Sequence, residues 1–196
     1  MKITVYGAAS DKIHEKFKKA GEALGREMGS RGHTLVFGGG DNGMMGAVAR
    51  GVSENQGEII GIAPTFFNVD GVLYEKCTKL IGTETMRERK KLLEDEADAF
   101  IITPGGVGTF DEFFEILTLK QLQQHNKAIA IFNIDGYFDD MLKMMQKGAD
   151  TEFISDSTLG LYQVFTDAGE MLDYLEEYMP KAEDVNRLRN LLEEKM

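Results

Sequence analysis

Residues 100–112 read FIITPGGVGTFDE and carry three local signals in a row. Residues 100–103 form a short, continuously apolar run, which is typical of a strand covered on both faces. Residues 104–108 are rich in glycine, and a helical pattern follows from Thr109 onward. A strand, a glycine loop and a helix in succession predict one unit of a parallel α/β sheet.

Strand and helix patterns alternate on both sides of this unit. The predicted strands are residues 3–6, 34–37, 58–63, 78–81, 100–103, 128–132 and 161–165. The predicted helices are residues 11–28, 44–53, 85–97, 109–124, 137–147 and 168–178. This order predicts a Rossmann-like, doubly wound parallel sheet flanked by helices on both faces, with residues 1–180 as a single domain and 181–196 as a helical tail. Ligands of such sheets bind at the carboxyl ends of the strands.

The composition limits the classes of function. The chain has 196 residues, of which 42% are hydrophobic and 28% charged, a balance typical of a soluble globular domain. Because 33 acidic residues outnumber 22 basic ones, the net charge is −11, which argues against a nucleic-acid partner. We find no signal peptide and no apolar stretch of the roughly 20 residues that a membrane span needs. The single Cys77 cannot form an intrachain disulfide and is interpreted as a small hydrophobic residue, so we expect a cytoplasmic protein.

A second glycine-rich loop, GGGDNGMMG at residues 38–46, also lies between a strand and a helix. It contains G-x-G-x-x-G, but no acidic residue ends the following strand, so a dinucleotide site is only weakly indicated. Both loops end where a helix begins, and backbone N–H groups at such a place favour an anion. No Lys-Ser/Thr pair follows the glycines of residues 104–108, so a monophosphate fits better than a nucleoside triphosphate.

Two further patterns each allow two interpretations. Thr109 and Glu112 have the spacing of a capping box, but Glu112 also falls at the rim of the predicted cleft. Residues 86–91, MRERKK, are the densest basic cluster of the chain. They form either an exposed stripe on a helix or a source of cations, Arg89 or Lys90, for the anion site. The three histidines have no metal-ligand spacing, so no metal site is predicted.

Three motifs together resemble one known family. They are GGG-x-x-G-x-M-G at residues 38–46, M-x-x-R-K at 86–90 and PGG-x-GT-x-x-E at 104–112. In this order they resemble the LOG (LONELY GUY) family, the cytokinin riboside 5′-monophosphate phosphoribohydrolases formerly described as possible lysine decarboxylases. The resemblance implies hydrolysis of the N-glycosidic bond of AMP or its N6-prenylated forms, without a cofactor, to free base and ribose 5-phosphate. It also implies a homodimer or a larger homo-oligomer.

The resemblance also implies roles for single residues. Arg89 and Glu112 fall at the positions assigned to catalysis. Glu112 is expected to stabilise the positive charge of the sugar and to activate water, and Arg89 to bind the phosphate or ribose. The positions implied to contact substrate are Gly39, Gly40, Met86, Lys90, Gly105, Gly106, Val107, Gly108, Thr109 and Thr118.

Other functions remain open at this point. A catalytically silent nucleotide-binding sensor could use the same loops. The interpretation as a Rossmann dehydrogenase is weakened, because the acidic residue that would bind the ribose is missing. Nothing marks a pyridoxal-phosphate lysine, which disfavours a lysine decarboxylase. The chain departs from the family at residues 119–123, LKQLQ, where members often have Trp-x-Gln-Leu-Gly, and at residues 65–75, which form a longer loop. Because of these departures, the resemblance leaves the base preference and the number of subunits open, but not the chemistry.

Overall fold

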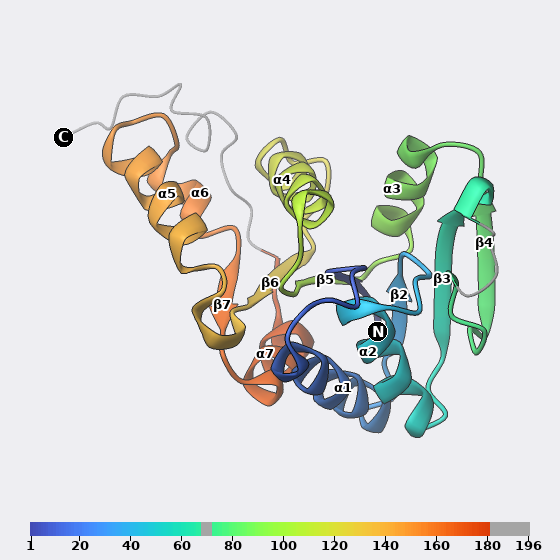
Figure 1. Cartoon of the computed structure of the whole chain (residues 1–196). Coiled ribbons are helices and arrows are strands. Elements are labelled where there is room, and N and C mark those ends of the chain that lie inside the picture. The colour runs from blue at the N-terminus through green and yellow to red at the C-terminus, as the bar shows by residue number, and fades with distance from the viewer. Residues whose placement is uncertain (68–71, 181–196) are drawn as a thin grey trace.

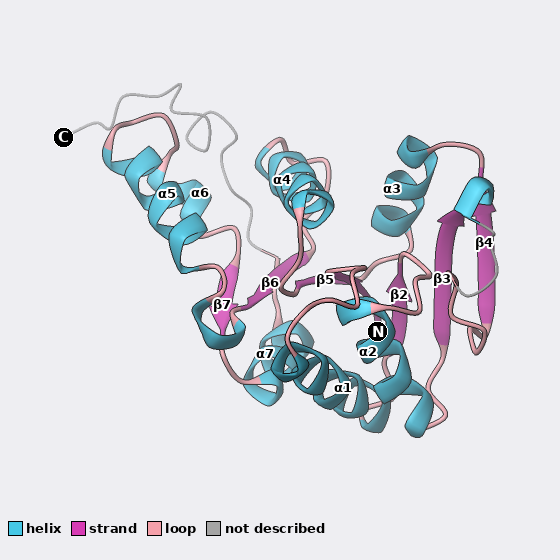
Figure 2. Cartoon of the chain, viewed as in Figure 1, coloured by secondary structure: helices cyan, strands magenta, loops and turns pink. Residues whose placement is uncertain are grey.

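Seven strands form one sheet in the computed structural model, which describes residues 1–67 and 72–180 (Figures 1 and 2). The strands are β1 (Lys2–Tyr6), β2 (Thr34–Phe37), β3 (Ile59–Pro64), β4 (Lys79–Thr83), β5 (Ala99–Ile102), β6 (Ala128–Phe132) and β7 (Gln163–Phe165). Their order is β4-β3-β2-β1-β5-β6-β7, and every pairing is parallel. The predicted doubly wound parallel sheet is therefore confirmed.

Helices cover both faces of this sheet, as predicted. They are α1 (Glu15–Ser30), α2 (Gly43–Glu54), α3 (Met86–Asp95), α4 (Val107–Gln121), α5 (Asp139–Asp150), α6 (Asp156–Leu159) and α7 (Ala168–Glu177). Figure 1 shows α1, α2 and α7 on one face and α3, α4 and α5 on the other. Alternate residues of β5 pack into the two cores, Ala99 and Ile101 into the first and Phe100 and Ile102 into the second. The continuous apolar runs of the sequence reflect this double coverage.

The helices α1 and α2 cross with their backbones in contact. A Cβ atom added to Gly25 would lie 2.1 Å from the carbonyl oxygen of Val48. A Cβ atom added to Gly51 would lie 2.2 Å from the carbonyl oxygen of Glu22. Both glycines are buried, so the crossing has no room for a side chain at either position.

We expect Gly25→Ala to lower the free energy of unfolding by about 1–3 kcal/mol, because the added methyl group forces the two helices apart. Urea denaturation measures the effect. Gly160→Ala is the matched control, since its Cβ atom would meet only the Ser157 carbonyl oxygen at 3.4 Å. The control should change stability by less than about 0.5 kcal/mol. Equal stability of the two variants would contradict the close crossing.

Several element boundaries differ from the prediction. Helix α1 begins at Glu15 and not at residue 11, because the His14 side chain caps it by accepting the N–H of Lys16. Helix α5 begins at Asp139 rather than at residue 137, because a 3₁₀ turn, Ile134–Gly136, precedes it. The short helix α6 was not predicted, and β7 is shorter than expected. The predicted helical tail at residues 181–196 lies outside the described residues.

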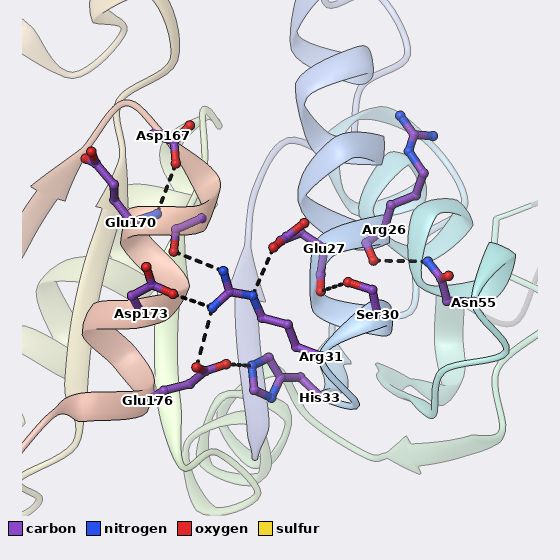
Figure 3. A network of polar contacts seen from close by, with 11 residues as sticks. Arg26, Glu27, Ser30, Arg31, His33, Asn55, Asp167, Glu170, Asp173 and Glu176 are labelled. Carbon is purple, nitrogen blue, oxygen red and sulfur yellow. Dashed lines mark hydrogen bonds and ion pairs between the residues drawn. The ribbon is translucent and has the colours of Figure 1, made fainter.

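A polar network fastens α7 to the end of α1 (Figure 3). Arg31 contacts Glu27 through Nε at 3.0 Å, and its Nη1 contacts Asp173 at 2.6 Å and Glu176 at 3.4 Å. His33 lies 2.8 Å from Glu176 through Nε2. Burial lowers the pKa of His33, so the neutral ring donates Nε2–H to the carboxylate. The network joins residues more than 130 positions apart in the sequence.

His125 follows the end of α4 and is partly buried against Phe100. Its Nε2 lies 2.8 Å from the carbonyl oxygen of Ile116, and its Nδ1 accepts the N–H of Lys127 at 3.3 Å. Burial lowers the pKa of His125 to about 4. The ring is therefore neutral at neutral pH and links Ile116 of α4 to Lys127, the residue before β6.

This pKa predicts a loss of stability in acid. The folded-state pKa lies below the unfolded value of about 6.5, so the unfolded chain binds the proton first. The stabilisation is present above about pH 6.5 and disappears as the pH falls towards 4. Between pH 7 and pH 4.5 we expect His125→Gln to lose about 1–2 kcal/mol less stability than the wild type does. Urea denaturation at both pH values measures this difference, and equal losses would contradict the prediction.

Cys77 is partly buried against the core on the α1 and α2 side, and burial raises its thiol pKa to about 11. The thiol is therefore protonated, in agreement with its interpretation as a small hydrophobic residue. Among the described helices, none is both long and apolar enough to cross a membrane.

Candidate active site

The carboxyl ends of β1, β2 and β5 bring three loops together. Strand β1 lies between β2 and β5, so the direction of winding changes beside it. The N–H of Ala8 donates to the Pro104 carbonyl at 3.1 Å, and a Cβ atom on Gly7 would lie 2.2 Å from Thr103 Oγ1. The segment after β1 therefore packs against the second glycine loop. Sequence reasoning missed this segment, although Gly7 directly after the first strand was a usable signal.

The N-terminus of α2 is occupied by groups of the chain itself. The N–H of Met45 donates to the Ala8 carbonyl at 3.3 Å. Hydrogen bonds from Lys18 and from the N–H of Gly43 lower the pKa of Asp11. The start of α2 thus has a carbonyl oxygen and an exposed carboxylate of the chain itself beside it. The predicted anion site at this helix stays a prediction.

The glycines of the first loop have a different use. The carbonyl of Gly39 accepts the N–H of Tyr74 at 2.8 Å, and Gly40 forms an antiparallel bridge with Leu73. A Cβ atom on Gly38 would lie 2.2 Å from Nη2 of Arg89. A side chain at this position would displace the guanidinium group from its present place. The first motif therefore supports the arginine of the second.

Arg89 and Glu112 form a buried ion pair between α3 and α4. Arg89 Nη1 lies 2.9 Å from Glu112 Oε1, and each residue is less than a tenth exposed. Burial raises the pKa of Glu112, and the charge of Arg89 opposes this rise without cancelling it. The structure thus brings together the two residues predicted to carry the chemistry. Neither was identifiable as a partner of the other from spacing alone.

The capping interpretation of Thr109 and Glu112 is wrong. Helix α4 begins at Val107 with Gly106 as its N-cap and has no side-chain cap. Thr109 instead packs on the glycine loop, where a Cβ atom on Gly105 would lie 2.1 Å from its Oγ1. The capping box of this region is at the start of α3, where Thr85 and Glu88 satisfy each other's backbone N–H groups. That box fixes the turn that carries Arg89.

The N-terminus of α4 is open, in contrast to that of α2. Gly106, Val107 and Gly108 are exposed, and their N–H groups have no acceptor in the described part of the chain. A Cβ atom on either glycine would meet nothing within 4 Å, and the first turn holds no acidic residue. Glu112 lies one turn beyond Gly108, about 6 Å along the helix axis. This end of α4 can therefore bind an anion close to the buried pair.

The basic run at residues 86–91 is divided among different partners. Lys90 contacts Asp111 at 3.0 Å and Glu115 at 2.9 Å, and Lys91 pairs with Asp95. Burial lowers the pKa of Lys90, but the two carboxylates raise it overall, so the amine is protonated. The run is thus not a uniformly positive patch, and Arg89 alone reaches Glu112.

The remaining predicted contact residues lie on the two helices. Met86 is exposed one turn before Arg89, and Thr118 is exposed nearly two turns after Glu112.

No three His, Cys, Asp or Glu side chains within residues 1–67 and 72–180 gather into a group that could hold a metal ion.

A cavity of about 350 Å³ lies at the amino ends of β6 and β7. This is the opposite edge of the sheet from the glycine loops, which follow the carboxyl ends of the strands. Lys120, Leu161, Gln163, Tyr174 and Tyr178 contribute to its lining. Burial lowers the pKa of Lys120 to about 8, and its Nζ donates to the carbonyl of Lys127 at 2.8 Å. This cavity is separate from the glycine loops.

The strand order and the open helix end at the change of winding place the chain in the class of Rossmann-like α/β proteins. Within this class, the sequence model of the family described as "possible lysine decarboxylase" matches residues 45–175. The chain belongs to this family, the LOG family.

Curated relatives match over most of the chain. The cytokinin riboside 5′-monophosphate phosphoribohydrolase LOG2 of Arabidopsis thaliana is 33% identical over 183 residues, covering 93% of this chain and 86% of the relative. LOG7 of the same plant, which has the same enzyme name, is 32% identical over 94% of this chain and 85% of its own.

Solved structures share the fold at lower identity. The molybdenum cofactor carrier protein of Chlamydomonas reinhardtii has a TM-score of 0.66 at 20% identity, covering 90% of this chain and 95% of its own. The molybdenum cofactor binding protein of Rippkaea orientalis has a TM-score of 0.65 at 18% identity, covering 89% and 93%. At these identities the likeness concerns the fold alone.

Proposed function

We propose that this protein hydrolyses the N-glycosidic bond of adenosine 5′-monophosphate or an N6-modified form of it. Water adds its hydroxyl to C1′ of the ribose and its proton ends on the released base, which leaves ribose 5-phosphate. The observation that carries the proposal is the buried Arg89–Glu112 pair one helical turn below the open N-terminus of α4. The enzyme names of the curated relatives support the same reaction.

The open end of α4 is the proposed phosphate site. The free N–H groups of Gly106, Val107 and Gly108 and the positive end of the helix dipole favour a phosphate dianion there. The phosphate does not react, so its binding energy serves to hold the sugar in position. With the phosphate bound at the first turn, the ribose extends along α4 towards Glu112.

Glu112 is the proposed catalytic carboxylate. Cleavage of the glycosidic bond builds positive charge on the sugar ring, and a nearby carboxylate stabilises this charge. Burial raises the pKa of Glu112, which makes the carboxylate a better base for the attacking water. Arg89 keeps the carboxylate ionised and fixes its orientation through the 2.9 Å contact. Lys90 does not replace Arg89 as the cation paired with Glu112, because it is protonated and held by Asp111 and Glu115.

The residues do not fit lysine decarboxylation with pyridoxal phosphate. A Schiff base needs a neutral lysine amine beside the phosphate site. Lys90, near α4, is protonated and paired. Lys120 has a lowered pKa but lies at the opposite edge of the sheet.

Product analysis tests the proposal. We expect incubation with AMP, prenyl-AMP, GMP and CMP to release free base and ribose 5-phosphate from the adenine nucleotides, as measured by chromatography. Comparing AMP with prenyl-AMP identifies the preferred base. Nucleotide binding without any release of base would instead support the sensor.

A further inference from the structure

The hydroxyl of Tyr137 holds the second glycine loop. Tyr137 lies between β6 and α5, and its Oη donates to the carbonyl oxygen of Gly105 at 2.5 Å. The side chain reaches the loop from a segment 32 residues further along the chain.

The segment around Tyr137 is fixed on both sides. Asp135 and Gly136 have φ angles of +54° and +69°, which turn the chain sharply after β6. The Asn133 side chain accepts the N–H of Phe138 at 2.8 Å, and its amide donates to Asp139 at 2.8 Å. The Tyr137 ring also packs edge-on against Phe17. The turn after β6 and the packing against Phe17 therefore both support the position of the hydroxyl.

This contact determines which way the loop's donors point. The carbonyl of Pro104 accepts the N–H of Ala8, and the carbonyl of Gly105 accepts the Tyr137 hydroxyl. In a trans peptide the N–H points opposite to the carbonyl, so the N–H of Gly106 points away from Tyr137. Gly106 has no neighbour that a Cβ atom would touch and has wide backbone freedom. The hydroxyl thus supplies an orientation that the glycines themselves do not impose.

We propose that Tyr137 is a positioning residue for the phosphate of the substrate, acting through the Gly105–Gly106 peptide. The inference rests on the proposed function, in which the open end of α4 binds that phosphate. The proposed role of Tyr137 concerns the phosphate and not the rest of the nucleotide. Loss of the hydroxyl weakens the binding of phosphorylated ligands and leaves the unphosphorylated nucleoside unaffected.

Tyr137→Phe tests this assignment, because it removes the hydroxyl and keeps the ring. The loss of one hydrogen bond that orders the site corresponds to a change of about tenfold in affinity. By titration calorimetry we expect a dissociation constant for ribose 5-phosphate about tenfold higher than that of the wild type. With AMP as substrate, KM rises by about the same factor and kcat changes less than about threefold. The affinity for adenosine is unchanged.

Tyr174→Phe is the matched control, because it removes the hydroxyl of a half-buried tyrosine at the opposite edge of the sheet. Both variants should unfold within about 2 °C of the wild type. Wild-type affinity of Tyr137→Phe for ribose 5-phosphate overturns the inference, as does a wild type that does not bind this ligand. If the wild type binds ribose 5-phosphate and Tyr137→Phe weakens that binding, but AMP is not cleaved, the proposed reaction is wrong and the role of Tyr137 stands.

Discussion

Glu112→Gln will lower kcat/KM for AMP by about 100- to 1000-fold or more while leaving the fold and the binding of AMP intact. Glutamine has the same size, and its amide oxygen can still accept the hydrogen bond that Arg89 Nη1 makes at 2.9 Å. The amide carries no negative charge and cannot take a proton from water. The hydrogen bond to Arg89 is kept, whereas the charge and the base that the transition state needs are lost.

Steady-state release of adenine measures this loss, and calorimetry with AMP measures the retained binding. Glu115→Gln is the matched control, because its carboxylate lies on the same helix and faces Lys90 rather than Arg89. The control should change kcat/KM by less than about threefold. A Glu112→Gln enzyme with more than about a tenth of wild-type activity would show that another group does the chemistry.

Arg89→Met will destabilise the protein by about 3–5 kcal/mol at pH 8, because it leaves the buried Glu112 carboxylate without its cation. Burial already raises the pKa of Glu112, and the loss of Arg89 raises it further. A carboxyl group with a raised folded-state pKa favours the folded state in acid and loses that stabilisation as the pH rises through the folded pKa. The defect of the variant is therefore larger at pH 8 than at pH 5. We also expect the variant to be less active towards AMP than the wild type.

Urea denaturation at the two pH values measures the effect. Arg87→Met, an exposed neighbour on α3, is the control and should change stability by less than about 0.5 kcal/mol. The double variant Arg89→Met/Glu112→Leu should regain most of the lost stability, since it removes the unpaired charge. A defect of equal size at pH 5 and pH 8 would show that lost packing, and not the bare carboxylate, causes it.

The sequence was sufficient to predict the alternation of strands and helices and the place of the two glycine loops between a strand and a helix. Apolar runs such as residues 128–132 became buried strands because the sheet is covered on both faces. The pairing of Arg89 with Glu112 depended on a family resemblance, since their 23-residue separation is not a helical or strand spacing. Periodicity alone left each of them with an ordinary surface interpretation.

Two identical local patterns show why the rest could not be predicted. Thr-x-x-Glu occurs at Thr85 and again at Thr109, but only the first forms a capping box. At the second, the glycines allow the helix to begin earlier, so Thr109 is already in the helix and Glu112 reaches Arg89. Similarly, the N–H of Met45 at the start of α2 donates to the Ala8 carbonyl, a tertiary contact that the two glycine loops do not reveal.

The central position of β1 has a consequence for how the chain folds. Ile3 pairs with Leu35 on one side and with Ala99 on the other. During synthesis on the ribosome, the first strand is therefore complete on one edge long before its second neighbour exists. Contacts so distant in sequence slow folding, and an unpaired strand edge invites association between chains. The strand at the centre of the finished sheet is thus, for a time, the exposed edge of the growing protein.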